Sequence, residues 1–391
     1  MGGGLADRVA GFGTSVFTEM SRLAAEHGAV NLGQGFPDFA GPDFVKEAAV
    51  RAIRADLNQY AVSHGAPRLR QAIAATWQRQ YGRTVEPEAE ITVASGATEL
   101  LLDAMLGLVN PGDEVILFEP CYDSYAPDVV MAGGIPRYIT LMPPDWRFDR
   151  QALADLFTPR TKLLLVNTPH NPTGKMFTRE ELRFIGDLCR RHDVLILTDE
   201  VYAEIRFDGA EHVPIATLPG MWERTLTLNS TGKTFSMTGW KIGYAVGPAD
   251  LNRAVRAAHQ FVTFATSTPF QEAMAVALET AQQQGYYETL RREYTDRRDA
   301  LREALAAAGL PVLPVQGAYF LMADFTALGF PDDVSFCRFL TREIGVAAIP
   351  PSAFYSDPAR APLLARFCFA KKPETLQAAA LRLARLASFH R

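Results

Sequence analysis

The sequence predicts an α/β protein in which a large domain holds a doubly wound, mostly parallel sheet and a smaller domain is α+β. Through the middle of the 391 residues, short runs of Val, Ile and Leu alternate with helical stretches. That alternation is typical of buried strands connected by helices. After about Pro269 the pattern changes to long helices followed by short strands, which indicates a second domain.

The elements of the sheet follow one another at short intervals. Strands are expected at residues 91–94, 113–119, 162–167, 194–198 and 225–230. Helices are expected from Thr98 to Val109, around 125–132 and from Thr178 to His192. Such brief aliphatic runs are typical of strands that helices cover on both faces.

The remaining elements belong to the second domain. Long helices are expected through 272–308, short strands at 318–325, 346–349 and 363–370, and a terminal helix after Pro373. The first forty residues are too few for a domain and are expected to pack onto this part. We therefore expect a large domain over 45–290 and a small domain formed by 1–44 and 291–391.

Composition narrows the class of protein. Hydrophobic residues make up 48% of the chain, charged residues 21%, and the net charge is −5, so nucleic acid is not an expected partner. No apolar run approaches the ~18 residues that span a bilayer, and the start does not resemble a signal peptide. The four cysteines lie far apart, which argues against disulfides and a zinc site and favours a cytoplasmic protein with no metal.

Polar groups follow four of the predicted strands directly. The first is followed by residues 95–98 (SGAT), a small-residue turn that feeds a helix and suits a phosphate. Later strands are followed by Asn171, by Asp199 with Tyr202, and by Lys233. Taken singly, these are a helix cap, a turn, an ion-pair partner and a surface lysine. Because ligands of open α/β sheets bind beyond the carboxyl ends of strands, their convergence predicts one site.

The motifs that hold these residues resemble the class I and II aminotransferase family, of pyridoxal-phosphate-dependent fold type I. The lysine motif, residues 230–243 (STGKTFSMTGWKIG), is the most specific of them. NPTG at 171–174, TDEVY at 198–202 and EPCYDSY at 119–125 come next. The similarity runs from NLGQGFPDF (31–39) to RFCFAK (366–371), and is greatest to bacterial methionine aminotransferases and kynurenine/glutamine aminotransferases.

The resemblance implies how the cofactor ring is held. Lys233 would carry pyridoxal phosphate as a Schiff base and, once released, move the Cα proton, both of which need an unprotonated amine. Asp199 would keep the pyridine nitrogen protonated, so that the ring withdraws electrons. Asn171 and Tyr202 would bind the ring's O3′. Tyr122 would stack on the ring face, although it could equally be a core aromatic residue.

The resemblance also implies a phosphate site and a homodimer. The phosphate would be bound by Gly96, Ala97, Thr98, the Ser230 hydroxyl and the Lys241 ammonium. Many relatives carry Arg at the position of Lys241, and an ammonium serves there as a point charge. Tyr60 would reach the phosphate of the neighbouring subunit, which requires two chains for each site.

The substrate is expected to be a large neutral amino acid: methionine, an aromatic residue, glutamine or kynurenine. Arg366 would clamp its α-carboxylate, with Asn171 beside it and Gly35 closing over it. Around the substrate side chain the resemblance places Phe17, Phe354 and the neighbour's Tyr60 and Phe264. No second arginine is found there for a distal carboxylate.

Three functions can use a pyridoxal-phosphate site of this kind. The first is transfer of the amino group to a 2-oxo acid. The alternative is a β-lyase that cleaves carbon–sulfur bonds of the cysteine-conjugate or cystathionine type, which would use the same residues and need no 2-oxo acid. A cofactor-binding transcription regulator would need a DNA-binding domain, for which the residues before Asn31 are too few.

Overall fold

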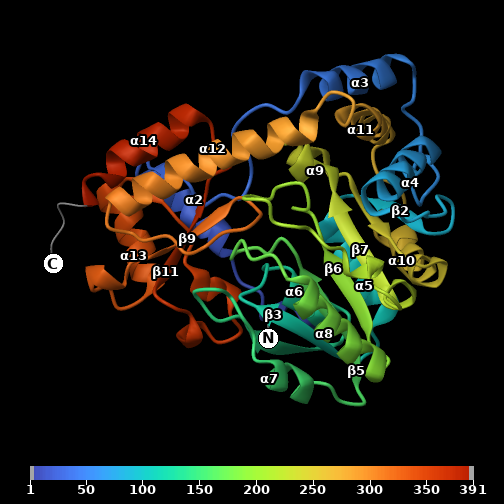
Figure 1. Ribbon diagram of the computed structural model, residues 1–391, viewed down its shortest axis with the longest axis horizontal. Helices are drawn as coiled ribbons and strands as arrows, with labels where there is room; N and C mark the ends of the chain where they lie inside the picture. The colour runs from blue at the N-terminus through green and yellow to red at the C-terminus, as the bar shows by residue number, and fades with distance from the viewer. Residues whose placement is uncertain (1–3, 387–391) are drawn as a thin grey trace.

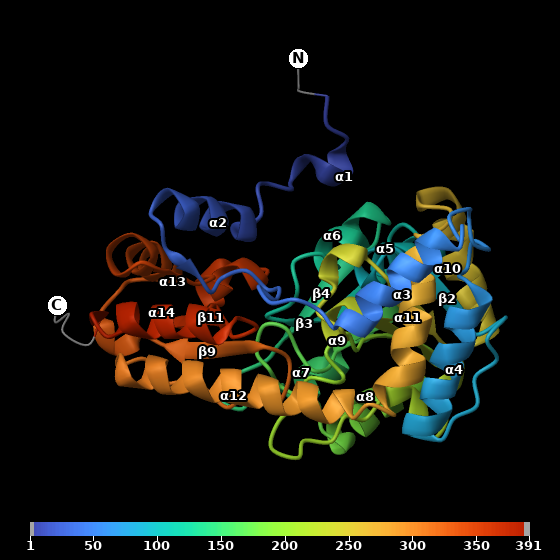
Figure 2. The same cartoon turned by 90° about the horizontal axis from the view of Figure 1, so that it is seen from above.

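The computed structural model describes residues 4–386 of the chain. Figures 1 and 2 show two halves, of which one holds a seven-stranded sheet and the other two two-stranded sheets. The strands are β1 (Val30–Asn31), β2 (Ile91–Ala94), β3 (Glu114–Glu119), β4 (Ile135–Thr140), β5 (Thr161–Asn167), β6 (Leu195–Asp199), β7 (Thr225–Ser230), β8 (Gly243–Val246), β9 (Phe320–Asp324), β10 (Val346–Ala347) and β11 (Leu364–Cys368). The helices are α1 (Asp7–Ala10), α2 (Val16–Glu26), α3 (Asp43–Arg54), α4 (Pro67–Tyr81), α5 (Ala97–Leu108), α6 (Tyr125–Met131), α7 (Arg150–Asp155), α8 (Arg179–Arg191), α9 (Thr231–Thr234), α10 (Ala249–Val262), α11 (Thr268–Ala281), α12 (Tyr286–Ala307), α13 (Asp333–Phe339) and α14 (Pro373–Leu383).

The large sheet has seven strands in the order β2-β8-β7-β6-β5-β3-β4. Neighbours from β7 to β4 are parallel, whereas β8 is antiparallel to both β2 and β7. The sheet is therefore mostly parallel, as the sequence predicts, and the carboxyl ends of β5, β6 and β7 meet at one edge.

Helices cover both faces of this sheet. Leu163 and Leu165 of β5 pack in a cluster with residues of α5, whereas Leu164 and Val166 pack in another with residues of α8. Alternate residues of one strand thus enter two separate cores, because successive side chains of a strand point to opposite faces. The continuous aliphatic character of β5 follows from this double burial.

The second half is built from the ends of the chain. β9 pairs with β11 and β1 pairs with β10, so strands near residue 30 and beyond residue 320 share one core. α12 runs alongside both halves in Figures 1 and 2. Its first residue, Tyr286, stacks on Phe235 of the large sheet's side, and its later turns pack on α14 and β9.

Three details differ from the sequence-based expectation. β4 and β8 were not predicted, and both belong to the large sheet. α11 and α12 divide the predicted helical region at Gly285, whose φ of +64° is left-handed. The N-terminal segment divides as well: α2 packs onto the second half, but α1 lies against α6 of the large sheet's half.

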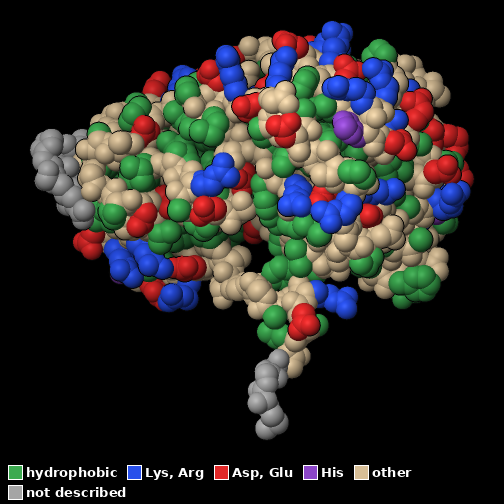
Figure 3. All heavy atoms as spheres, turned by 90° about the horizontal axis from the view of Figure 1, so that it is seen from below, with side chains coloured by type: hydrophobic (Ala, Val, Ile, Leu, Met, Phe, Trp, Pro, Cys, Tyr) green, Lys and Arg blue, Asp and Glu red, His purple; other side chains and the backbone are tan. Residues whose placement is uncertain are grey.

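Two further observations concern the surface. Among residues 4–386, every helix is too short or too polar to span a lipid bilayer. On the face shown in Figure 3, Lys and Arg side chains are interspersed with Asp and Glu, so this face carries no extended basic area. All four cysteines are buried and unpaired.

Candidate active site

A cavity of about 320 Å³ lies where the strands of the large sheet end, beside the second half of the molecule. All but three of the predicted site residues line it. They are Phe17, Gly35, Gly96, Ala97, Thr98, Tyr122, Asn171, Asp199, Tyr202, Ser230, Lys233, Lys241 and Arg366. Residues separated by up to 349 positions in the sequence are therefore brought to one cavity, as the convergence of strand ends predicts.

Lys233 enters the cavity from α9, directly after β7. Its Nζ donates a hydrogen bond to the Tyr319 hydroxyl at 3.1 Å, and that hydroxyl donates to the backbone oxygen of Gly35. Burial lowers the pKa of Lys233 to about 8, helped by the nearby Lys241 and Arg366 charges and opposed by Asp199. The amine is thus much closer to its reactive, unprotonated form than a solvated lysine.

Asp199 ends β6 and is buried at the bottom of the cavity. Its Oδ2 accepts a hydrogen bond from the Tyr125 hydroxyl at 2.7 Å, and its Oδ1 accepts one from the Val201 N–H at 3.1 Å. Burial raises the pKa of Asp199, while these two hydrogen bonds and the Lys233 charge oppose that rise. A carboxylate held this rigidly can pair with a cationic ring nitrogen.

Arg366 is 1% exposed and lies on β11, opposite the sheet edge. One guanidinium nitrogen donates to Asn171 Oδ1 at 3.1 Å and another to the Gly33 carbonyl at 2.9 Å. Its Nε has no hydrogen-bond partner among the described residues, and Asp123, the carboxylate whose charge raises its pKa, forms no hydrogen bond with it. Since a buried cation without a directly bonded anion is costly, the arrangement suits an incoming carboxylate.

Aromatic rings surround the guanidinium of Arg366. The Phe320 ring centroid is 4.2 Å from its central carbon, and those of Phe17 and Phe354 are 5.1 Å away. Phe354 is buried and packs against Phe17 with ring centroids 5.9 Å apart, so it supports the cavity wall without lining it.

The opposite end of the cavity is built for an anion. Gly96 has φ +86° and ψ 168° and precedes α5, whose N-terminus carries the positive end of the helix dipole. A Cβ added at Gly96 would lie 3.5 Å from Lys241 Nζ, so the ammonium stands directly beside this turn. The Ser230 hydroxyl lines the same cavity. The residues present therefore fit the phosphate of pyridoxal phosphate.

Tyr60 and Phe264 lie outside the cavity of their own chain. Both are exposed, and their rings pack edge to face with centroids 5.3 Å apart. The resemblance to the aminotransferase family assigns both residues to the active site of the neighbouring subunit.

Some residues at the cavity were not assigned from the sequence. They are Tyr125 at Asp199, Tyr319 at Lys233, Phe320 under Arg366, and Asn167, whose amide binds the Asp199 carbonyl at 2.9 Å. Tyr125 belongs to the motif at 119–125 and Asn167 ends a predicted strand, so both carried a usable signal. Tyr319 and Phe320 come from the second half, and no sequence motif indicated that they reach the site.

Comparison with known proteins is consistent with this geometry. The family model described as "Aminotransferase class I and II" matches residues 27–383. Methionine aminotransferase of Escherichia coli (strain K12) is 44% identical, with 96% of each chain covered. A probable N-succinyldiaminopimelate aminotransferase of Mycobacterium tuberculosis is 45% identical (97% of this chain and 98% of that one), and a kynurenine–oxoglutarate transaminase of Dictyostelium discoideum is 42% identical (94% and 93%).

Solved structures agree with the sequence comparisons. The crystal structure of Escherichia coli YbdL, for which a methionine aminotransferase function was identified, superposes with a TM-score of 0.94 at 43% identity, covering 97% of this chain and 99% of that one. The predicted fold type is thereby confirmed. With a cavity that fits pyridoxal phosphate, the cofactor of the family, the chain belongs to the class I and II aminotransferases.

Proposed function

We propose that this aminotransferase moves the amino group of a large neutral amino acid, such as methionine, an aromatic residue, glutamine or kynurenine, to a 2-oxo acid. One observation carries the choice of substrate. Among the described residues that line the cavity, the only cationic side chains are Lys233, Lys241 and Arg366. Lys233 and Lys241 are assigned to the cofactor, so Arg366 alone is available for a substrate carboxylate.

The walls of the cavity support the same choice. Phe17, Phe36, Leu101 and Phe320 contribute apolar surface to the cavity, and the rings of Phe17 and Phe320 lie at Arg366. A thioether or aromatic ring buried against such walls gains roughly 1.5–3 kcal/mol. A second carboxylate buried without a cation would cost several kcal/mol.

The assigned roles follow from the contacts of each side chain. Bound pyridoxal phosphate supplies an electron-withdrawing ring that stabilises negative charge at the substrate's Cα. Lys233 would attach the cofactor covalently and, once released, accept the Cα proton. Asp199, Asn171 and Tyr202 would orient the ring, and Arg366 would orient the substrate through its α-carboxylate.

A substrate panel tests the proposal. We expect kcat/KM, measured with one 2-oxo acid acceptor, to be higher for methionine, phenylalanine, glutamine and kynurenine than for aspartate. N-succinyldiaminopimelate belongs in the panel because it is named for one relative. Aspartate or N-succinyldiaminopimelate exceeding every neutral donor would contradict the proposal. Release of pyruvate from cysteine conjugates without any 2-oxo acid would instead support the β-lyase alternative.

We further propose that the protein is a cytoplasmic homodimer and that its domains comprise 45–290 and 1–44 with 291–391. The unpaired state of all four cysteines supports a reducing compartment. Exposed aromatic side chains near Tyr60 and Phe264 support the dimer. The separation of the seven-stranded sheet from the two two-stranded sheets supports the domain division.

A further inference from the structure

A buried polar cluster lies directly beneath the proposed phosphate site. It consists of Glu99 and Asp103, one turn apart on α5, and His259 on the neighbouring α10. His259 and Asp103 are fully buried, and the Glu99 side chain is 7% exposed. None of the three lines the active-site cavity.

The two ring nitrogens of His259 both face oxygen acceptors. Nδ1 lies 2.6 Å from Glu99 Oε1, and Nε2 lies 2.7 Å from the backbone carbonyl oxygen of Ser63. A carbonyl oxygen can only accept a hydrogen bond, so Nε2 carries a hydrogen. The other oxygen of Glu99 accepts from the Ser95 N–H, and this bond helps to lower the pKa of Glu99. A Glu99 carboxylate can only accept from Nδ1, so the imidazole then carries a hydrogen on Nδ1 as well.

The surroundings agree with a charged imidazole at His259. Burial opposes the charge, but the hydrogen bond and charge of Glu99 and the Ser63 carbonyl raise the pKa of His259. Both carboxyl oxygens of Asp103 lack a hydrogen-bond partner among the described residues, and Oδ2 lies 3.7 Å from His259 Nδ1. Burial and the nearby Glu99 charge raise the pKa of Asp103 to about 7, against the opposing charge of His259, which favours a neutral Asp103 in weakly acidic solution.

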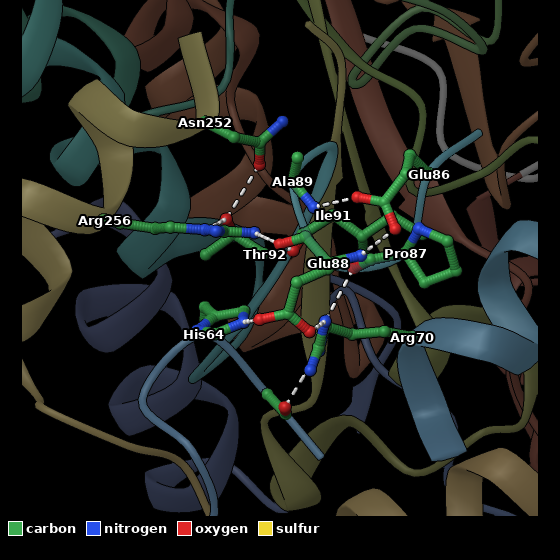
Figure 4. Close-up of polar contacts among 11 residues, drawn as sticks. His64, Arg70, Glu86, Pro87, Glu88, Ala89, Ile91, Thr92, Asn252 and Arg256 are labelled. Atoms are coloured by element: carbon green, nitrogen blue, oxygen red, sulfur yellow. Dashed lines mark hydrogen bonds and ion pairs between the residues drawn. The ribbon is translucent and has the colours of Figure 1, made fainter. Parts of the chain in front are cut away.

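Hydrogen bonds connect the cluster to two segments of the proposed active site. Glu99 binds the backbone of Ser95, the first residue of the turn that leads into Gly96–Thr98. His259 binds the backbone of Ser63, in the segment that carries Tyr60. A second set of side chains also holds that segment: His64 is hydrogen-bonded to Glu88, and Glu88 pairs with Arg70 (Figure 4).

We propose that charged His259, acting through Glu99, is a positioning residue for the phosphate of the cofactor. His259 holds Glu99 in place, Glu99 holds the Ser95 N–H, and the turn then presents Gly96–Thr98 to the phosphate. Through Ser63 the same imidazolium fixes the Tyr60 segment, which in the proposed dimer serves the other active site. The inference rests on the assignment of the phosphate to this turn.

Cofactor affinity with and without the phosphate tests the proposal. We expect His259→Gln and Glu99→Gln to raise the Kd of the apoprotein for pyridoxal phosphate about tenfold or more, the size expected for losing a hydrogen bond between charged groups. The Kd for pyridoxal, which lacks the phosphate, should change less than twofold. Equal losses for both ligands, or no loss for either, would overturn the proposal.

Three control variants separate the possible failures. His192→Gln makes the same chemical change at the end of α8, before β6 and at the edge of the sheet opposite the turn, so both Kd values should stay unchanged. Asp103→Asn keeps the shape of a neutral acid and should also leave both unchanged at pH 6. Lys241→Ala should weaken binding of pyridoxal phosphate alone. If it does not, the phosphate assignment is wrong, whatever His259 does.

Two measurements on the wild-type protein test the proposal without depending on the folding of a variant. With ¹⁵N-labelled histidine, the ring of His259 should show hydrogens on both nitrogens at pH 6, and a ring with only one would overturn the proposal. The same three side chains could also hold a divalent cation. If the protein retains one metal ion per chain after dialysis, these side chains bind a metal ion and not the protons of a charged His259. That result would equally overturn the proposal.

Discussion

Burial shifts the titration of Lys233 and Asp199 in opposite directions at the centre of the cavity. It lowers the pKa of Lys233 to about 8 and raises the pKa of Asp199, so each group is displaced toward its neutral form. The Tyr125 hydroxyl and Val201 N–H restrain the shift of Asp199. The lysine therefore becomes a nucleophile near neutral pH while the carboxylate keeps hydrogen bonds that favour its charge.

The pKa of Lys233 gives the first prediction. Only the unprotonated amine attacks an aldehyde, and its population rises about tenfold for each pH unit below the pKa. The rate at which pyridoxal attaches to the apoprotein should therefore rise with pH up to about 8 and then level off. Absorbance spectroscopy follows the attachment, and Nα-acetyllysine, whose rate should keep rising toward pH ~10.4, is the control.

Identification of the modified residue completes this test. Borohydride reduction and peptide mapping should place pyridoxal phosphate on Lys233, and Lys233→Ala should give no adduct. An adduct on any of the other lysines, or a rate that still rises above pH 9, would contradict the assignment.

The turn between β2 and α5 depends on a backbone shape that glycine alone adopts readily. At φ +86° and ψ 168°, any residue with a Cβ is strained by about 1–3 kcal/mol. Gly96→Ala should therefore destabilise the fold and distort the phosphate site together. We expect a lower urea midpoint and a weaker affinity for pyridoxal phosphate.

Gly82→Ala is the matched control for that prediction. Gly82 ends α4 with φ +68°, and a Cβ there would meet no atom within 4 Å. Its replacement should lower the urea midpoint by a comparable amount and leave cofactor affinity unchanged. Equal loss of affinity in both variants would show that general destabilisation, not the turn, explains the effect.

The elements that the sequence predicted are those whose pattern reflects burial on both faces. β2 and β7 were predicted with their observed bounds, because each is a short aliphatic or Thr/Leu run between turns. β4 was missed because it is an edge strand with several partly exposed residues, and its sequence, IPRYIT, lacks that pattern. β8 was missed because its four residues lie between glycines, close behind the lysine motif.

The same distinction holds for the candidate site. Lys233, Asp199 and Asn171 follow predicted strands, so the topology of a parallel sheet brings them together. Tyr319 reaches Lys233 from β9's side of the molecule, across 86 positions of sequence. No local pattern predicts such a contact, because it depends on how the two halves pack.

The exposed aromatic side chains of Tyr60, Phe261 and Phe264 form an apolar surface that a single chain leaves in water. Tyr60 is 83% exposed, Phe261 84% and Phe264 47%. Leu57, Val62 and Val262, from the same two segments of the chain, are exposed as well. Apolar surface of this kind marks an interface, and a two-fold dimer would bury the same surface on both chains. Sedimentation should accordingly show a dimer, and a fully active monomer would contradict the proposal.

Mixing two inactive variants tests whether each active site needs both chains. Tyr60→Ala and Lys233→Ala should each lose most activity alone. In a hybrid dimer, the site that retains Lys233 also receives an intact Tyr60 from its partner, while the other site has lost both. If half of the dimers are hybrids, the mixture should recover about a quarter of the wild-type activity.

A mixture of Lys233→Ala with Asp199→Ala is the control. Each chain supplies both residues to its own site, so no hybrid dimer contains an intact active site. Recovery in this control, or none with the Tyr60 variant, would mean that Tyr60 does not serve the neighbouring active site.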